Sequence, residues 1–209
     1  MKLAEPKQSI LTDGILKDIV DETRVDGLVF QNEACGYSLD HMEFYECVFR
    51  NVEFTGSMKE CLFVDTVFDH CDLSNVDLQS SAFRRVRIRN CRMTGTDLSG
   101  SRFQDVSFTD VQAGYINLNG SRFLRVLFKD NVMDHAGLSM CEQKELEIRE
   151  CRLEHTEFFQ TKLNGVDLSD SEVSNLTVTP ESLQGLAVNE EQAAAFAALF
   201  GLIVKQKAY

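Results

Sequence analysis

The sequence predicts an all-β fold, a parallel β-helix with four sides, followed by a short α-helix. Large apolar residues return every five positions, and similar residues return every twenty. A period of five fits neither the 3.6-residue repeat of an α-helix nor the two-residue repeat of a β-strand. It fits a chain that turns a corner every five residues and closes a square coil after twenty. The final helix is predicted by an alanine-rich segment with start and stop signals.

The five-residue series of large apolar residues runs from Phe63 to Val178, and only Ala113 and Gln143 interrupt it. A smaller residue precedes most members by two positions, and the other positions are mostly polar. The twenty-residue period shows as columns of identical residues, with Phe at 63, 83, 103 and 123 and Leu at 78, 98, 118 and 138. Such stacking in register is typical of solenoids, whose repeats contact only their neighbours.

Three five-residue segments, Cys71–Asn75, Thr96–Gly100 and Val166–Asp170, resemble the pentapeptide-repeat motif A(D/N)LXX. The resemblance extends over about residues 37–178. It implies a right-handed quadrilateral β-helix in which the central Leu or Phe and the small residue both point inward.

The predicted organisation is an N-terminal cap over 1–36, a β-helix over 37–178 and a C-terminal strand–helix–strand module over 179–209. A cap would cover unpaired strand edges, which otherwise favour aggregation. The early run of Leu39, Phe44, Phe49 and Phe54 keeps the period, but Phe63 follows nine residues later. One residue is therefore missing near 55–58. Glycine at position 56 permits a tight corner there, so we expect a local irregularity and no domain boundary.

The C-terminal helix is expected over about 190–200. Asn189 is suited to the N-cap, Gln192 completes a capping box and Gly201 suits the end. The apolar residues here either fold onto the last coil as a cap or also join two shafts end to end. The order of elements resembles the C-terminal dimerisation module of the Qnr and MfpA proteins, which implies a homodimer interface formed by Phe196, Leu199, Phe200, Leu202, Ile203 and Val204.

Few residues are candidates for catalysis or for metal binding. Six of the seven cysteines, at 47, 61, 71, 91, 141 and 151, fall in the small inward position and are expected to pack as small hydrophobes. Cys35 lies outside the clear register and stays undecided. His135 and His155 are twenty residues apart, so they form either a pair of solvated side chains or a metal clip. We find no phosphate-binding loop, nucleophile elbow or zinc motif. The expectation is a non-enzyme without catalytic residues, cofactor or metal.

The net charge of −12 opposes direct binding to nucleic acid or to an anionic membrane. No apolar stretch approaches the roughly 20 residues of a membrane span. The first residues also lack the apolar region of a signal peptide, so a cytoplasmic location is expected.

Two charged groups are candidates for partner binding. Counting by twenty gives an acidic ladder, formed by Asp110, Asp130, Glu150 and Asp170, with members about 4.8 Å apart. Stacked like charges are unfavourable, so either chance or function must explain the ladder. The neighbouring Lys129 and Arg149 partly neutralise it. The second group is a basic cluster, which is either a solvated face or a docking site for an acidic patch of a partner; it comprises Arg84, Arg85, Arg87 and Arg89.

The resemblance to Qnr and MfpA proteins implies the partner. It is a type II topoisomerase, DNA gyrase or topoisomerase IV, bound by a DNA-mimicking acidic rod that protects it from fluoroquinolones and confers quinolone resistance. The unbroken register leaves no room for the long loops of the Gram-negative Qnr proteins. The chain therefore resembles the loopless MfpA type, and gyrase inhibition without protection stays open. The alternative from another class is a structural scaffold with an unrelated partner.

Overall fold

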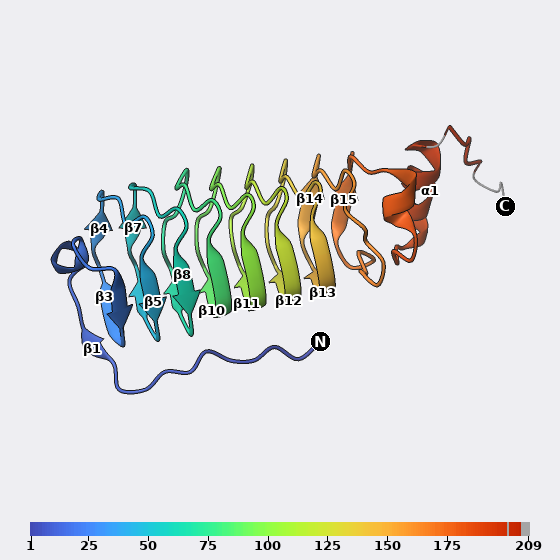
Figure 1. The fold of residues 1–209 in the computed structure, drawn as a ribbon. Helices are drawn as coiled ribbons and strands as arrows, with labels where there is room; N and C mark the ends of the chain where they lie inside the picture. Colours follow the sequence, from blue (N-terminus) through green and yellow to red (C-terminus); the bar gives the residue numbers. More distant parts are fainter. Residues whose placement is uncertain (200, 206–209) are drawn as a thin grey trace.

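The five-residue period becomes a shaft of stacked square coils in a computed structural model that describes residues 1–199 and 201–205 (Figure 1). The predicted right-handed quadrilateral parallel β-helix with a short C-terminal α-helix is confirmed. The early strands are β1 (Thr12–Asp13), β2 (Arg24–Asp26), β3 (Leu28–Gln31), β4 (Ala34–Cys35), β5 (Glu43–Tyr45), β6 (Val48–Arg50), β7 (Glu53–Phe54), β8 (Leu62–Val64) and β9 (Val67–Asp69). The later strands are β10 (Ala82–Arg89), β11 (Arg102–Thr109), β12 (Arg122–Lys129), β13 (Glu142–Arg149), β14 (Arg152–Glu154) and β15 (Glu172–Ser174).

Each coil has four sides and four corners. In the coil of residues 81–100, we number the sides 1 to 4 as 81–84, 86–89, 91–94 and 96–99, and corners 1 to 4 as 85, 90, 95 and 100. Strand β10 covers sides 1 and 2, whereas single bridges such as Asp97 with Asn117 connect side 4 to the next coil. All four corner residues have positive φ, between 53° and 69°. Asn, Asp and Gly tolerate this left-handed region best, which explains why polar residues and glycines recur at the corners.

The inward columns form the core. Phe83 pairs with Phe103 in register, and their rings stack with centroids 5.0 Å apart. The seven cysteines are buried free thiols, as the packing interpretation predicts for six of them. Burial raises the pKa of the Cys61 thiol to about 12, so this thiol stays protonated at neutral pH. Cys35 also points inward, since it pairs with Phe54 of the next coil.

The shaft begins before residue 37. Strands β2, β3 and β4 pair in parallel with β5, β6 and β7, so residues 24–35 already form a coil within the segment that we expected to be a cap. Glu53 pairs with Asp72, nineteen residues on, whereas Leu62 pairs with Ala82, twenty on. The missing residue therefore lies at the expected corner. A side chain at Gly56 would place its Cβ 1.8 Å from the carbonyl oxygen of Tyr37.

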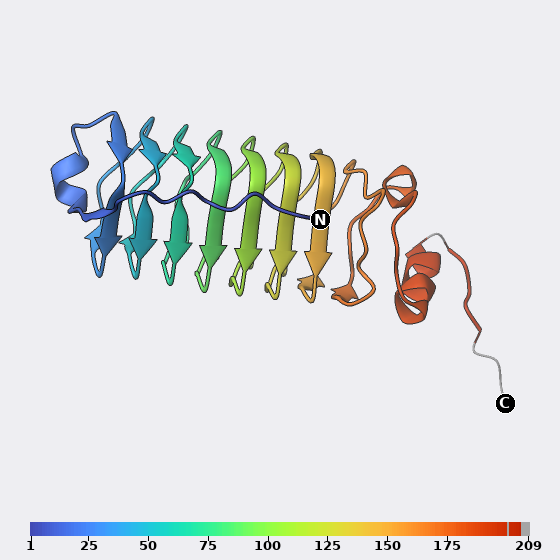
Figure 2. The same cartoon turned by 90° about the horizontal axis from the view of Figure 1, so that it is seen from below.

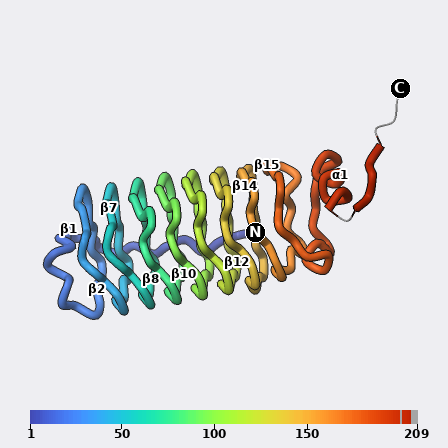
Figure 3. Tube along the Cα trace, turned by 90° about the horizontal axis from the view of Figure 1, so that it is seen from above, coloured from blue at the N-terminus to red at the C-terminus, as the bar shows by residue number. Residues whose placement is uncertain are grey.

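Both ends carry additional segments. Residues 1–9 lie along the outside of the shaft and run from β13, beside which the N-terminus lies, toward the first coils (Figure 2). We call these nine residues the N-terminal arm; the 3₁₀ helix η1 (Leu16–Ile19) follows them. The 3₁₀ helix η2 (Pro180–Leu183) and helix α1 (Glu190–Leu199) lie at the opposite end (Figure 3). No helix within the described ranges is long and apolar enough to cross a membrane.

Candidate protein-binding surface

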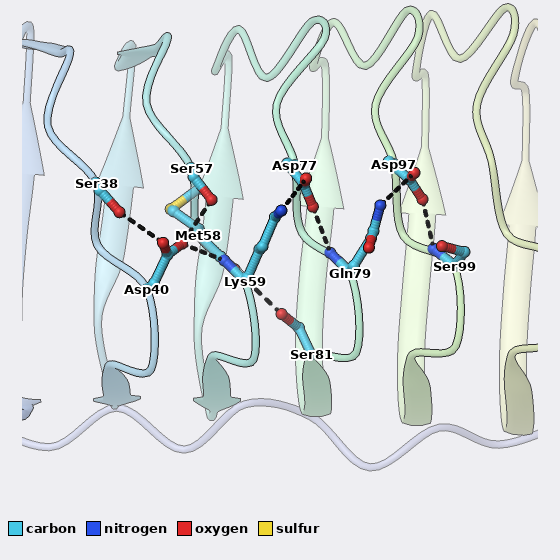
Figure 4. Close-up of polar contacts among 10 residues, drawn as sticks. All are labelled: Ser38, Asp40, Ser57, Met58, Lys59, Asp77, Gln79, Ser81, Asp97 and Ser99. Atoms are coloured by element: carbon cyan, nitrogen blue, oxygen red, sulfur yellow. Dashed lines mark hydrogen bonds and ion pairs between the residues drawn. The ribbon is translucent and has the colours of Figure 1, made fainter.

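Many carboxylates of the shaft have structural roles. Asp97, the second residue of a repeat, accepts a hydrogen bond from the backbone N–H of Ser99 at 2.9 Å and another from Gln79 Nε2 at 2.8 Å (Figure 4). Asp77 accepts the N–H of Gln79 at 3.2 Å and pairs with Lys59 Nζ at 2.8 Å. These contacts explain why Asp or Asn suits this motif position: the side chain satisfies a backbone donor in the turn. Such carboxylates are therefore partly committed to the fold.

The four members of the acidic ladder do form one column. They lie at corner 2, where Asp110, Asp130 and Glu150 all have positive φ and are exposed. Asp170 is exposed as well, and its Oδ1 accepts the backbone N–H of Glu150 at 3.2 Å. Lys129 Nζ lies 3.5 Å from carboxylate oxygens of both Asp130 and Glu150. One lysine thus shields the middle of a ladder that otherwise faces solvent.

A shallow hollow of about 420 Å³ adjoins the ladder. Asp130, Glu150 and Asp170 line it together with Arg152 and Glu172. Arg152 pairs with Asp134, so it does not neutralise the ladder. The hollow is consequently a mainly acidic surface.

The four arginines of the predicted basic cluster lie on different parts of one coil: Arg84 on side 1, Arg85 at corner 1, and Arg87 and Arg89 on side 2. Arg85 makes two hydrogen bonds to the carboxylate of Asp65, at 2.6 and 2.5 Å. Arg87 pairs with Glu5 at 3.1 Å, and Arg89 pairs with Asp69 at 2.9 Å. Consecutive residues around a corner point in different directions, which explains why neighbours in sequence do not form one patch. Arg84, on side 1, is the member without an ion-pair partner among residues 1–199 and 201–205.

A different basic strip was missed by the sequence reasoning. It follows side 1 over β10–β13 and comprises Arg84, Arg102, Arg122 and Lys144, all exposed. Its members stand in two adjacent columns, at 84 and 144 and at 102 and 122. Counting by twenty along the outward positions of side 1 would have found it.

Helix α1 is fixed to the end of the shaft by its predicted capping box. Gln192 N donates to Asn189 Oδ1 at 2.9 Å, and Asn189 N donates to Gln192 Oε1 at 3.0 Å. Gln192 Nε2 then reaches the carbonyl oxygens of Leu168 and Ser171, both at 2.8 Å. The helix therefore caps the last coil.

The residues predicted for the dimer interface lie differently. Phe196 is partly buried against the shaft core, while Leu199, Leu202, Ile203 and Val204 are exposed, Ile203 to 87%. Phe200 lies outside the described residues. A hollow of about 330 Å³ between α1 and residues 173–176 is lined mainly by apolar side chains. An apolar surface thus remains at this end, and its role as an interface stays a prediction.

The two predicted histidines belong to an exposed column at corner 3. The rings of His135 and His155 stack with centroids 5.0 Å apart, and Tyr115 stacks on His135 at 4.7 Å. Among the described residues no group of three potential metal ligands is present. The column is a row of stacked rings on the surface.

The repeat, the square coils and the inward columns define a class of protein. Residues 61–138 match the family model described as a pentapeptide repeat region. This segment of the chain therefore carries pentapeptide repeats. No curated protein matches its sequence.

Among solved structures, the chain is similar to full-length QnrB1, a plasmid-mediated fluoroquinolone resistance protein. The identity is 17%, 86% of this chain and 90% of that chain are covered, and the TM-score is 0.43. A trypsin-treated form of QnrB1 gives 22% identity, coverage of 87% and 90%, and a TM-score of 0.36. HetL, a pentapeptide repeat protein involved in heterocyst differentiation regulation in a Nostoc cyanobacterium, gives 11% identity, coverage of 80% and 85%, and a TM-score of 0.30.

Proposed function

We propose that the protein binds a type II topoisomerase, DNA gyrase or topoisomerase IV, in place of duplex DNA and thereby protects the enzyme from fluoroquinolones. The observation that carries the proposal is the outward column of Asp110, Asp130, Glu150 and Asp170 on a straight shaft. The resemblance of the repeats and of the C-terminal module to Qnr and MfpA proteins supports the choice of partner.

The ladder presents a regular row of negative charges, as a DNA strand does. Its carboxylates follow one another about every 4.8 Å, and the phosphates of one DNA strand follow every 3.4 Å or so along the axis. Internal ion pairs engage Arg85, Arg87 and Arg89, so these arginines add less positive charge to the surface than the sequence suggests. A basic DNA channel would therefore attract the edge of the shaft that carries the acidic ladder.

The exposed apolar end supports the second part of the proposal, a homodimer. Burying Leu199, Leu202, Ile203 and Val204 against a second copy would remove four exposed apolar side chains from water. Two shafts joined end to end would give a rod of about 80–100 Å with caps, from a coil spacing of about 4.8 Å. Such a protein acts by occupying a surface, which requires no catalytic group, and its partner places it in the cytoplasm.

The ladder can be tested by combining Asp110→Lys, Asp130→Lys and Asp170→Lys in one variant. We expect loss of gyrase binding at low salt, measured by surface plasmon resonance. The control combines Asp21→Lys, Glu22→Lys and Glu181→Lys, which are exposed, lie off the ladder and change the net charge equally. Unaltered affinity of the ladder variant, or an equal loss in both variants, would contradict a specific role for the ladder.

The homodimer can be tested by Leu202→Asp combined with Ile203→Asp, both exposed, so that folding is preserved. Light scattering of the wild-type chain is expected to give twice the chain mass, and the variant to give the mass of one chain. A wild-type monomer, or a variant that keeps the dimer mass, would contradict the end-to-end arrangement.

A further inference from the structure

Side 1 carries the basic strip of Arg84, Arg102, Arg122 and Lys144, on a protein whose net charge is −12. Strands β10–β13 present these side chains outward, next to corner 1. The acidic ladder lies on corner 2, at the far edge of side 2. The two charged surfaces are therefore separate.

Three of the four members of the strip carry positive charge that the described residues do not neutralise. Arg102 and Arg122 are direct register partners on neighbouring strands, an arrangement that is unfavourable for like charges. Arg122 pairs with Glu142 at 3.0 Å. Arg84, Arg102 and Lys144 make no ion pair with any residue in the described ranges. The nearby Arg85 and Arg125, at corner 1, each make a two-point contact with an aspartate, so the lack of partners on side 1 is a local property.

The strip surrounds a hollow of about 500 Å³ with an apolar component. Leu62, Ala82 and Leu124 contribute to its lining. The three strand intervals from β10 to β13 measure about 14 Å, which is the length of four or five extended residues. A surface of this length suits a short peptide segment. It is too short for a long duplex, which the net charge would also repel.

The N-terminal arm demonstrates how an extended segment can follow this shaft. Ala4 N donates to Asp105 Oδ1 at 3.3 Å, and Lys7 N donates to Asp65 Oδ1 at 2.9 Å. These two acceptors are two coils apart, about 9.6 Å, and three extended residues span about 9.9 Å. An extended chain therefore stays in step with the coils when every third residue makes a contact.

We propose that the basic strip binds an extended acidic segment of a partner protein, with carboxylates three positions apart. One carboxylate pair would meet Arg84 and Arg122, or Arg102 and Lys144. Each of these pairs is two coils apart along the shaft and two positions apart across it, an offset that the long arginine and lysine side chains can span. Arginine suits this role because its planar guanidinium can donate two hydrogen bonds to one carboxylate. The hollow receives an apolar side chain beside the acids. This binding is independent of the topoisomerase proposal, because it uses another side of the shaft.

The test is a titration of the isotope-labelled full chain with a short synthetic peptide that carries two glutamates three positions apart and one leucine, followed by two-dimensional NMR. An isomer with adjacent glutamates serves as the comparison. We expect amide shifts confined to side 1 of β10–β13 and several-fold tighter binding of the first peptide. No shifts on side 1, or equal affinity for both peptides, would overturn the proposal.

Variants assign the binding to the strip. Arg102→Glu combined with Lys144→Glu is expected to weaken binding at least tenfold. Lys17→Glu combined with Arg50→Glu, both exposed and off side 1, is expected to leave it unchanged. Equal affinity of the two variants, or preferential binding of a DNA oligonucleotide by the wild type, would refute the proposal. The strip variant should still bind gyrase, so failure here is distinguishable from failure of the topoisomerase proposal.

Discussion

Corner 1 and corner 2 of the shaft have the same backbone conformation in most coils but differ in how their charges are arranged. At corner 1, acids and arginines alternate along the shaft, for example Asp65, Arg85, Asp105 and Arg125. At corner 2, the ladder from Asp110 to Asp170 has one sign of charge. These four residues of corner 1 have positive φ, and so do the first three members of the ladder, so the backbone does not account for the difference. The order of charges decides which edge is neutralised within the fold and which stays available to a partner.

The two corners also differ in how deeply their acidic residues are buried. Asp105 is only 4% exposed, and both its oxygens accept hydrogen bonds from Arg125 at 2.7 Å. The N-terminal arm covers this edge by donating backbone N–H groups to Asp105 and Asp65. The ladder residues are exposed and have no covering segment in the described part of the chain. Corner 1 is therefore expected to contribute to stability, and corner 2 to binding.

The largest expected effect separates the two edges directly. Asp105→Asn should reduce the free energy of unfolding by about 2–3 kcal/mol, because it leaves Arg125 without its charged partner in a partly buried site. Asp130→Asn should change it by less than about 0.5 kcal/mol, or raise it slightly, because it removes a like-charge neighbour from an exposed column. Urea denaturation of both variants measures the difference. Similar losses would contradict the division.

The stability that Asp105 contributes should depend on pH. The hydrogen bonds from Arg125 are the main reason why the pKa of Asp105 lies below its usual value. The unfolded chain therefore binds this proton at a higher pH than the folded chain does. The resulting stability is complete above about pH 4, the ordinary pKa of Asp, and is lost as the pH falls through the lower folded value.

Urea denaturation from about pH 3 to 7 checks this dependence. The stability difference between the wild type and Asp105→Asn should shrink below about pH 4, because protonation removes the charge that the substitution removes. The Asp130→Asn variant serves as the control, and it should follow the wild-type profile. A difference for Asp105→Asn that stays constant down to the lowest pH would contradict the role of this ion pair.

The smallest expected effect is that of salt on the melting temperature. Added sodium chloride screens repulsion between the exposed ladder residues, so it should raise the melting temperature slightly at constant pH. The rise should be smaller in Asp110→Asn combined with Asp170→Asn, which removes two of the four charges. Differential scanning calorimetry is the measurement. An identical salt response of the two proteins would show that repulsion within the ladder is negligible.

Most of the fold could be predicted from the sequence because the period of five maps directly onto the sides and corners of a coil. The first coil was not predicted for two reasons. Cys35 occupies the position that holds Phe54 in the next coil, and Leu39 follows Cys35 after only four residues, which breaks the five-residue period. The shift of register near Gly56 was predictable, since the spacing from Phe54 to Phe63 is one residue short of ten.

The surface was less predictable. Counting by twenty finds the ladder and would have paired Arg85 with Asp65 and Arg125 with Asp105, each twenty residues apart. The contact of Arg87 with Glu5 could not be found in this way. The arm has no period, and it binds largely through backbone N–H groups, which every residue except proline possesses.

The most direct test of the central claim is a gyrase supercoiling assay with and without ciprofloxacin over a titration of this protein. The proposed function predicts that supercoiling is restored in the presence of the drug, and that the triple lysine variant of the ladder does not restore it. Inhibition without rescue would contradict protection and leave a DNA competitor. The absence of any effect at every concentration would contradict topoisomerase binding and favour a scaffold with an unrelated partner.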